Sequence, residues 1–443
     1  MTKRHGYALL AAIVAVIVVI SAAIYIGVAA DEGGGQSNLA GGRAPRGSAA
    51  PASTGTWVGA WSASPAGAEP GTETAGMAGH SVRNVVHTGA GGTSARITLS
   101  NLYGQQPLTV THATIAVAET PNSATAKAGT MTRLAFGGGS TSVVIPSGQQ
   151  VLSDAVGVDI PPDADVLVTT FSPAPSGPVT YHPHARQISY LADGDLSDEV
   201  SGVSYTVQTP YWRYLTAVDV LSDEAEGTVV ALGDSLTDGD ASTVGANHRW
   251  TDYLSDRLRA AAGTDGVPRY SVVNQGIGGN RILASSLGRP ADNPSALSRF
   301  SRDVLERPNV KAVVIDLGIN DILRNPNEVD PTTITDGLRA LVAQAHAHGL
   351  RVVGATLMPF QGHGGYTDQR EAVREAINTE IRSGKVFDAV VDFDKAVRDP
   401  YNPRRFQSEY DSGDHLHPGD KGYERMAQVF DLTSLKGAVA AAL

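Results

Sequence analysis

The sequence predicts two folded regions in tandem, an all-β domain followed by an α/β domain with a parallel sheet. Short runs rich in β-branched residues, separated by turn signals, occupy residues 57–223 with no convincing helix between them. After residue 226, apolar strands alternate with helical segments, which is typical of a parallel sheet. A length of 443 residues is too great for one ordinary core and also favours two domains.

The N-terminal segment indicates export. Lys3 and Arg4 precede an uncharged stretch at 8–30 that is long enough, as a helix, to span hydrocarbon. Because a cleavable signal has a shorter apolar region, we expect an uncleaved anchor, with cleavage near Ala30 as the alternative. In both cases the rest of the chain is extracytoplasmic, anchored or secreted. Residues 31–56 are mostly Gly, Ala, Ser, Pro and Thr and predict a disordered spacer.

Charge and composition exclude several kinds of partner and site. A net charge of -11 at pH 7, with no local cluster of Lys and Arg, argues against nucleic-acid binding. We expect membrane contact only through the N-terminal segment. The chain has no cysteine, which excludes disulfides and thiolate metal sites.

The β domain, residues 57–223, is predicted from closely spaced apolar runs. Gly-Gly, Pro-Ser-Gly and Pro-Pro-Asp turn signals separate them, a pattern that favours an all-β sandwich or jelly roll. The runs are 95–99, 108–118, 142–145, 155–160 and 166–171.

The α/β domain, residues 226–443, is predicted from five strands and five helices in alternation, which make a three-layer α/β/α arrangement. Asp330 and Pro331 are suited to the N-cap and first turn of one helix, and Gly349 to its C-cap. The predicted strands are 228–232, 270–274, 310–317, 350–357 and 387–393, and the predicted helices 250–262, 296–306, 332–348, 367–383 and 420–443.

Three polar or glycine positions follow strands of this sheet. Ser235, Gly279 and Asn320 each fall just beyond a predicted strand end, and the carboxyl ends of parallel strands meet at one rim. Farther along, Asp414 and His417 stand three residues apart on one loop. A serine hydroxyl needs a base to take its proton, and an imidazole needs an acid to fix its tautomer. The sequence therefore predicts a catalytic triad of Ser235, Asp414 and His417.

Four segments stand in the order of the blocks of the SGNH, or GDSL, hydrolases, which the chain resembles over about residues 228–430. They are Gly-Asp-Ser-Leu at 233–236, Asn-Gln-Gly-Ile-Gly-Gly-Asn at 274–280, Gly-Ile-Asn-Asp at 318–321 and Asp-x-x-His at 414–417. The resemblance implies a flavodoxin-like three-layer domain without a cofactor. It also implies an oxyanion hole made by the backbone N–H groups of Ser235 and Gly279 and the side-chain amide of Asn320. Thr237 replaces the second glycine of a Gly-x-Ser-x-Gly elbow, which argues against the α/β-hydrolases.

Neighbouring residues allow other interpretations. Asp234 is expected to brace the turn before the nucleophile rather than act as an acid, and Asn280 and Asp321 to make local hydrogen bonds. His415 is the rival base, but the Asp-x-x-His-Pro register falls on His417.

The sequence gives only weak evidence for a metal site, and we expect no metal. His182 and His184 share a strand face without an evident third ligand, whereas His346 and His348 cannot share a helix face. Asp residues at 234, 238 and 240 hint at a cation loop but lack the other ligand positions of one.

Trp250 and Arg281 are candidates for lining the substrate cleft, with a core position as the alternative for Trp250. Segments 237–239, 246–250 and 279–283 resemble one branch of the family, extracellular acylhydrolases found near xylan-degrading enzymes. This likeness implies deacetylation of sugar esters, with an acetylated polysaccharide among the candidate substrates.

The leading hypothesis is therefore an exported serine esterase that hydrolyses short-chain acyl esters of carbohydrate through an acyl-enzyme. The absence of a long apolar lid in the sequence favours short acyl groups. One alternative is a lipase- or lysophospholipase-type acylhydrolase, and another is an acyltransferase to a sugar or wall polymer. A third, from another class, is an inactive surface protein that binds glycan.

Overall fold

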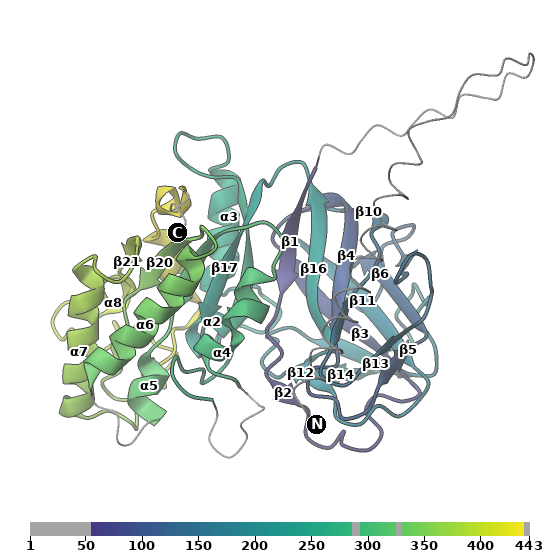
Figure 1. Ribbon diagram of the computed structural model, residues 1–443, viewed down its shortest axis with the longest axis horizontal. Helices are drawn as coiled ribbons and strands as arrows, with labels where there is room; N and C mark the ends of the chain where they lie inside the picture. Colours follow the sequence, from purple (N-terminus) through teal and green to yellow (C-terminus); the bar gives the residue numbers. More distant parts are fainter. Residues whose placement is uncertain (1–54, 286–292, 325–329, 438–443) are drawn as a thin grey trace, which may run out of the picture. The chain divides into compact units, whose positions relative to one another are not determined.

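The computed structural model describes residues 55–285, 293–324 and 330–437, and residues 54–443 form one compact unit (Figure 1). The predicted anchor or signal at 8–30 lies outside the described residues, as does almost all of the predicted spacer. Within the described part of the chain, no helix has both the length and the apolar character needed to cross a bilayer.

A β-rich region comes first, as predicted. One sheet has the strand order β1-β16-β4-β10, with β9 beside β4, and a second has the order β14-β13-β3-β11-β6-β7. Small sheets join β15-β12-β2 and β5-β8. The strands are β1 (Thr56–Ser62), β2 (Gly67–Ala68), β3 (His80–Thr88), β4 (Gly92–Ser100), β5 (Leu108–Val110), β6 (His112–Val117), β7 (Thr132–Arg133), β8 (Val143–Ile145), β9 (Gln150–Leu152), β10 (Val156–Ile160), β11 (Ala164–Ser172), β12 (Thr180–His182), β13 (Ser189–Asp193), β14 (Val207–Thr209), β15 (Trp212–Arg213) and β16 (Leu215–Ser222).

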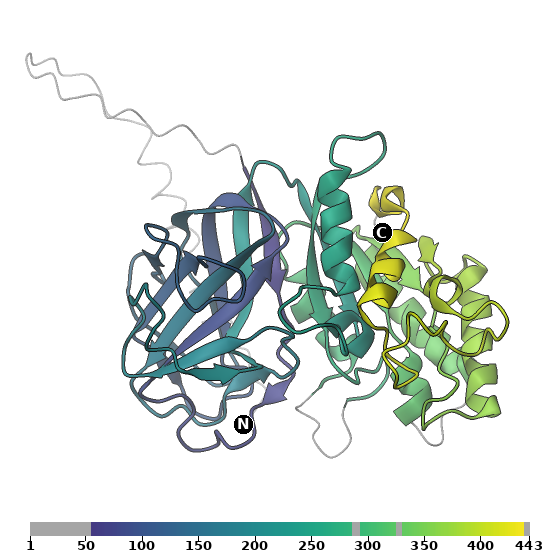
Figure 2. The same ribbon diagram turned by 180° about the vertical axis from the view of Figure 1, so that it is seen from behind.

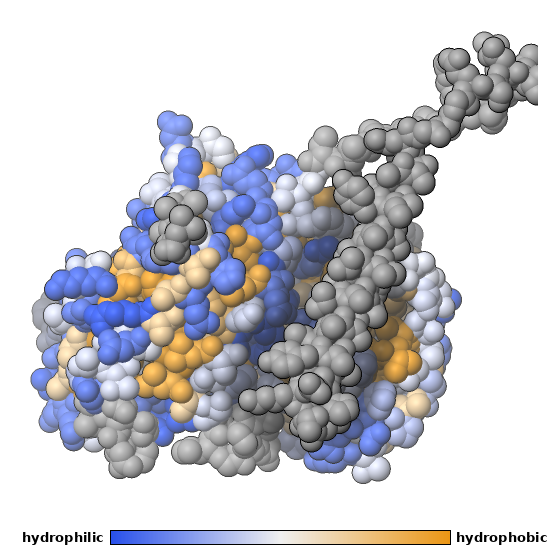
Figure 3. Space-filling view, in the orientation of Figure 1, coloured by the Kyte–Doolittle hydropathy of each residue, from blue (hydrophilic) through white to orange (hydrophobic). Residues whose placement is uncertain are grey.

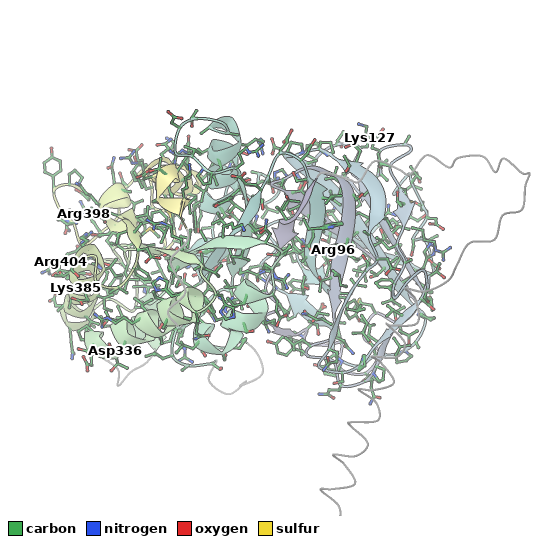
Figure 4. The ribbon with its side chains drawn as sticks, turned by 45° about the horizontal axis from the view of Figure 1, so that its top comes forward. Arg96, Lys127, Asp336, Lys385, Arg398 and Arg404 are labelled. Carbon is green, nitrogen blue, oxygen red and sulfur yellow. The ribbon has the colours of Figure 1, made fainter. Side chains whose placement is uncertain are left out.

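Alternation along these strands places one side of each sheet in a shared hydrophobic core. Ile97 of β4 and Val168 of β11 belong to this core, although they come from different sheets. Arg96, labelled in Figure 4, is on the opposite face of β4. It pairs with Asp219 of the neighbouring strand at 3.1 Å and lies over the ring of Trp57.

The α/β region holds a parallel sheet of five strands in the order β18-β17-β19-β20-β21, a doubly wound order. Its strands are β17 (Gly227–Gly233), β18 (Tyr270–Gly276), β19 (Val310–Asp316), β20 (Arg351–Ala355) and β21 (Ala389–Val391). Its helices are α2 (Ser235–Asp238), α3 (Trp250–Ala260), α4 (Ala296–Phe300), the π-helical η1 (Ser301–Leu305), α5 (Ile319–Arg324), α6 (Pro331–His346), α7 (Asp368–Arg382), α8 (Phe393–Val397), α9 (Asp420–Gln428) and the 3-10 turn η2 (Leu432–Leu435).

Helices cover both faces of this sheet. Val230 and Val313 point into a core shared with α4, α6 and α7, whereas their neighbours Val229 and Ala312 point into one shared with α3, α8 and α9. Figure 1 shows α4 and α6 on the near side, and Figure 2 shows α3 and the C-terminal helix on the other. The exposed surface around α6 mixes hydrophilic and hydrophobic residues (Figure 3).

The predicted strands overlap the observed ones, but three helical predictions need correction. The segment 296–306 is α4 followed by a π-helical turn. The helix predicted for 420–443 ends at Gln428, because Asp431 caps a separate 3-10 turn; residues 438–443 lie outside the described residues. Asp330 caps α6 as predicted, but that helix ends at His346, and Gly349 comes three residues later in a left-handed turn.

The β-rich region packs against the α/β region. The backbone N–H of Gly59 donates to Thr228 Oγ1 at 3.0 Å, and Gln275 Nε2 donates to Ser62 Oγ at 2.7 Å. A Cβ on Gly59 would lie 2.8 Å from Cγ1 of Val273, so a larger residue here would separate β1 from β18. Glycine thus allows the close approach of the two regions.

Candidate active site

Ser235 lies at the carboxyl end of β17, as the sequence predicts. The strand ends at Gly233, and Ser235 opens α2. Asp234 is the N-cap of this helix, and its Oδ1 accepts the N–H of Leu236 at 3.0 Å. Asp234 thus braces the turn, and Ser235 is 5% exposed.

A continuous chain of hydrogen bonds joins Ser235, His417 and Asp414. His417 Nε2 lies 2.8 Å from Ser235 Oγ, and Nδ1 lies 2.6 Å from Asp414 Oδ2. Because a carboxylate only accepts, Nδ1 carries the proton, and Nε2 is left to accept the serine proton. Burial tends to raise the pKa of Asp414, but hydrogen bonds from His417 hold it at about 2. The carboxylate therefore stays charged across the neutral range.

His415 is directed away from this chain. Its Nδ1 lies 2.6 Å from Asp411 Oδ2, and the backbone at His415 is left-handed, with φ 62°. The loop from Asp411 to Pro418 thus presents the two imidazoles to different carboxylates, and only His417 contacts Ser235.

Asn320 lies in the first turn of α5 with both ends of its amide engaged. Its Nδ2 donates to Asp234 Oδ2 at 3.1 Å, and its Oδ1 accepts from Arg324 Nε at 3.1 Å. An amide nitrogen has two protons, so one remains for a ligand. Arg324 stands four residues after Asn320, one helical turn away, and this spacing is the signal by which the sequence could have identified it.

Two of the three glycine N–H groups at 276–279, where β18 ends, already have hydrogen-bond acceptors. The N–H of Gly276 donates to Asn274 Oδ1 at 2.8 Å, and that of Gly278 donates to Asp238 Oδ2 at 3.1 Å. Gly279 has φ +72°, and a Cβ there would lie 2.8 Å from Cζ of Arg324. Glycine is therefore required at 279, and its N–H is the candidate donor of this segment.

Two buried carboxyl groups lie beneath the nucleophile. Burial raises the pKa of Asp234 and also that of Asp316, the last residue of β19. Asp316 Oδ2 accepts the hydroxyl of Thr237 at 3.1 Å. These groups accept hydrogen bonds from Leu236 and Thr237, the two residues that follow Ser235, so they support the turn rather than the reacting atoms.

Asn280 and Asp321 make local hydrogen bonds, as expected. Asn280 Oδ1 accepts from Arg299 Nε at 3.1 Å, and Asp321 accepts the N–H groups of Ile282 and Leu283.

The prediction that Trp250 lines the cleft is wrong. Trp250 is 0% exposed and packs in the core beside Phe393, because it begins α3 on the sheet-facing side. Arg281 is 6% exposed and donates to the carbonyl of Ser285, so its guanidinium serves its own loop. Neither residue forms an open substrate surface in the structure.

The histidine and aspartate candidates for a metal have other partners. His182 bonds Asp238 and the carbonyl of Ser64, and Asp240 bonds His184. Across 55–285, 293–324 and 330–437, no group of three or more His, Cys, Asp or Glu side chains could hold a metal.

Arg299 is a structural residue of the site that the sequence did not reveal. It is fully buried and donates to the carbonyls of Gly233 at 2.9 Å and Gln275 at 2.8 Å, at the ends of β17 and β18. It also pairs with Asp303 at 2.9 Å. An arginine on an amphipathic segment is usually exposed, so no local pattern could have identified this role.

Comparisons with known proteins bear on residues 231–425, which match the model of the GDSL-like lipase/acylhydrolase family. No functionally curated protein matches the chain. Among solved structures, a putative lipolytic protein of the G-D-S-L family from Desulfitobacterium hafniense is 22% identical, with a TM-score of 0.35 over 46% of this chain and 97% of that one. A carbohydrate acetylesterase from Sinorhizobium meliloti is 16% identical (TM-score 0.35; 46% and 95% covered). An aryl esterase from M. smegmatis is 17% identical (TM-score 0.36; 46% and 95% covered).

Proposed function

We propose that Ser235 is the nucleophile of this protein, that His417 is its general base and that Asp414 is the acid that orients the base. The premise is that the protein belongs, through residues 231–425, to the GDSL-like lipase/acylhydrolase family and is a carboxylic ester hydrolase. The observation that carries the proposal is the hydrogen-bonded chain from Ser235 Oγ through both ring nitrogens of His417 to Asp414, at 2.8 and 2.6 Å.

In the first half of the reaction, Ser235 Oγ attacks the ester carbonyl while His417 Nε2 takes its proton. Asp414 stabilises the imidazolium that forms. The imidazolium then gives its proton to the departing alcohol, and an acyl-serine remains. In the second half, water attacks the acyl-serine with His417 again as base, which releases the acid and restores Ser235.

The oxyanion of each tetrahedral intermediate is proposed to lie against Ser235, Gly279 and Asn320. The N–H of Ser235 is in the first turn of α2 and has no intrahelical acceptor. The second amide proton of Asn320 is fixed in direction, because Asp234 and Arg324 hold the rest of the group. Donors that are already aimed in this way contribute about 3 kcal/mol each in comparable sites.

As substrate we propose short-chain acyl esters, acetyl above all, of carbohydrate. The support is the likeness of segments 237–239, 246–250 and 279–283 to acylhydrolases found near xylan-degrading enzymes. Comparison of aryl esters from acetate to decanoate, together with acetylated xylan, tests the acyl length and the alcohol. A preference for decanoate would contradict the proposal.

The nucleophile can be tested directly with a fluorophosphonate and mass spectrometry. We expect one adduct, on Ser235, and none in Ser235→Ala. Ser242→Ala is the matched control: Ser242 is a buried serine of the same loop whose hydroxyl bonds the carbonyl of Gly239, so the variant should label fully. An adduct on another residue, or no adduct on folded protein, would rule out the assignment.

We also propose that the enzyme acts outside the cytoplasm. The support is the 8–30 segment with its basic start. Alkaline extraction of membranes and N-terminal sequencing of the mature protein distinguish an anchor from cleavage near Ala30, and a cytoplasmic protein with an intact N-terminus would contradict export.

A further inference from the structure

A histidine of the β-rich region reaches the candidate active site. β12 ends at His182, whose Nδ1 donates to the carbonyl of Ser64 at 2.8 Å and whose Nε2 lies 2.9 Å from Asp238 Oδ1 in α2. His184 follows two residues later, and its Nδ1 lies 3.3 Å from Asp240 Oδ1. The buried His182–Asp238 contact thus fixes the segment that carries His184.

Asp240 lies beside the reacting nitrogen of the proposed base. Its Oδ2 is 3.9 Å from His417 Nε2, the same atom that contacts Ser235 Oγ. The backbone of Asp240 is held twice, because its N–H donates to the carbonyl of Ser235 at 3.0 Å and its carbonyl accepts the hydroxyl of Tyr423 at 2.6 Å. These bonds fix the backbone that carries the carboxylate, and His184 holds the carboxylate itself.

His184 also borders the loop of the proposed oxyanion hole. Its Cδ2 lies 3.4 Å from the position that a Cβ on Gly278 would occupy, and Gly278 precedes Gly279. Its side chain contacts Asp240 and remains 48% exposed. The hydrogen bond with Asp240 raises the pKa of His184, which favours a ring that donates from both nitrogens.

The leaving alcohol must lie close to His417 Nε2, since this atom returns the proton to it. We propose that His184 and Asp240 form the subsite for this alcohol and that they select a hydroxylated one, such as a sugar, over an aliphatic or aryl alcohol. The inference rests on the proposed function. A donating imidazole beside an accepting carboxylate matches vicinal hydroxyls, whereas an apolar alcohol would offer no hydrogen bond to His184 Nε2 or Asp240 Oδ2, the two atoms outside the His184–Asp240 bond.

A ratio of two esters with the same acyl group tests this inference. For the wild type and His184→Phe, kcat/KM is measured with an acetylated xylo-oligosaccharide and with 4-nitrophenyl acetate. Phe keeps a ring but cannot donate, so we expect the ratio of sugar ester to aryl ester to fall about tenfold, mainly through KM for the sugar ester. His184→Gln, which retains a donor, should recover part of the ratio.

A second measurement examines the alcohol alone. The wild type and His184→Phe form the same acetyl-serine from 4-nitrophenyl acetate, and added xylose then competes with water for the acetyl group. In the transfer, a xylose hydroxyl attacks the acetyl carbonyl, gives its proton to His417, and displaces Ser235. We expect a smaller share of acetyl xylose with His184→Phe than with the wild type.

His346→Phe is the matched control, because His346 also pairs with an aspartate, Asp388 at 3.1 Å, near the opposite end of the strands. Its ratio should equal that of the wild type. A ratio unchanged in His184→Phe, or an equal fall for both esters, would overturn the subsite. A wild-type protein that folds but hydrolyses neither ester and resists the fluorophosphonate would instead overturn the proposed function.

Discussion

Arg299 offers the sharpest test of how the site is held together. Its side chain is fully buried and donates to two strand-end carbonyls, to Asn280 Oδ1, to Ser64 Oγ and to Asp303 Oδ2. We consider Arg299→Met, which keeps the approximate length of the side chain and removes all of these hydrogen bonds. Asp303 would keep Arg302 as a partner, at 2.6 Å.

The expected cost follows from the groups left behind. Breaking a buried ion pair by removing one partner costs about 3 to 5 kcal/mol, and each buried carbonyl without a donor adds to this. With about 2 cal/mol/K of unfolding entropy per residue, the compact unit 54–443 has roughly 0.8 kcal/mol/K. A loss of about 4 kcal/mol therefore lowers Tm by about 5 °C.

The assay is thermal unfolding monitored by differential scanning calorimetry, with Arg339→Met as the control. Arg339 pairs with Asp336 and Glu380 on the surface, and such pairs contribute about 1 kcal/mol or less, so its Tm should move by about 1 °C. Arg299→Met should also lower kcat at least tenfold well below its Tm, because Ser235 and Gly279 both follow the strand ends that Arg299 joins. A Tm no lower than that of Arg339→Met would refute the reasoning.

Four other outcomes are expected. Asn320→Ala should lower kcat about 10²- to 10³-fold with little change in KM, and a change confined to KM would contradict its role as an oxyanion donor. Asp414→Asn should lower kcat about 10³- to 10⁴-fold, because an amide stabilises the wrong imidazole tautomer; near-normal kinetics would exclude the triad. Burial raises the pKa of Asp316 to about 7, so as the pH rises from about 4 to 7 the unfolded state loses this proton before the folded state does, and folding stability falls. Asp316→Asn should therefore flatten the decline of Tm over this pH range, and an unaltered profile of Tm against pH would contradict the assignment. Deletion of 57–222 should give insoluble or inactive protein, and a soluble fragment of full activity would disprove the dependence on the β-rich region.

The sequence predicted the parallel sheet and its candidate site because both depend on local signals. Each strand of the sheet is a short apolar run, and the residues that matter follow directly at the strand ends. Ser235, His417 and Asp414 come together as expected. Among the three glycines at 276–279, the family resemblance already pointed to Gly279. The structure adds that hydrogen bonds use the N–H groups of the other two, Gly276 and Gly278, which no sequence pattern shows.

The strand β3 shows where local signals fail. Its sequence contains Arg83 and Asn84, which suggest a polar surface, yet both are fully buried. Arg83 donates to Thr169 Oγ1 and to the carbonyls of Ala124 and Glu199. These partners are 41 to 116 residues away along the chain, so no window of sequence could have matched them. The same holds for Arg299, whose partners come from both regions.

The link between the two regions shows why the β-rich region belongs to the catalytic framework. β16 ends at Ser222 and β17 begins at Gly227, so a short connection joins a central strand of one sheet to the strand that leads to Ser235. A hydrogen bond from Gln275 to Ser62 joins the edge strands β18 and β1. A second hydrogen bond, from Arg299 to Ser64, joins the two regions near the carboxyl ends of the parallel strands. A module that only bound glycan would need none of these bonds beside the nucleophile. Because fixed donors contribute to catalysis only while their supports are rigid, the bonds between the regions help to define the geometry of the site.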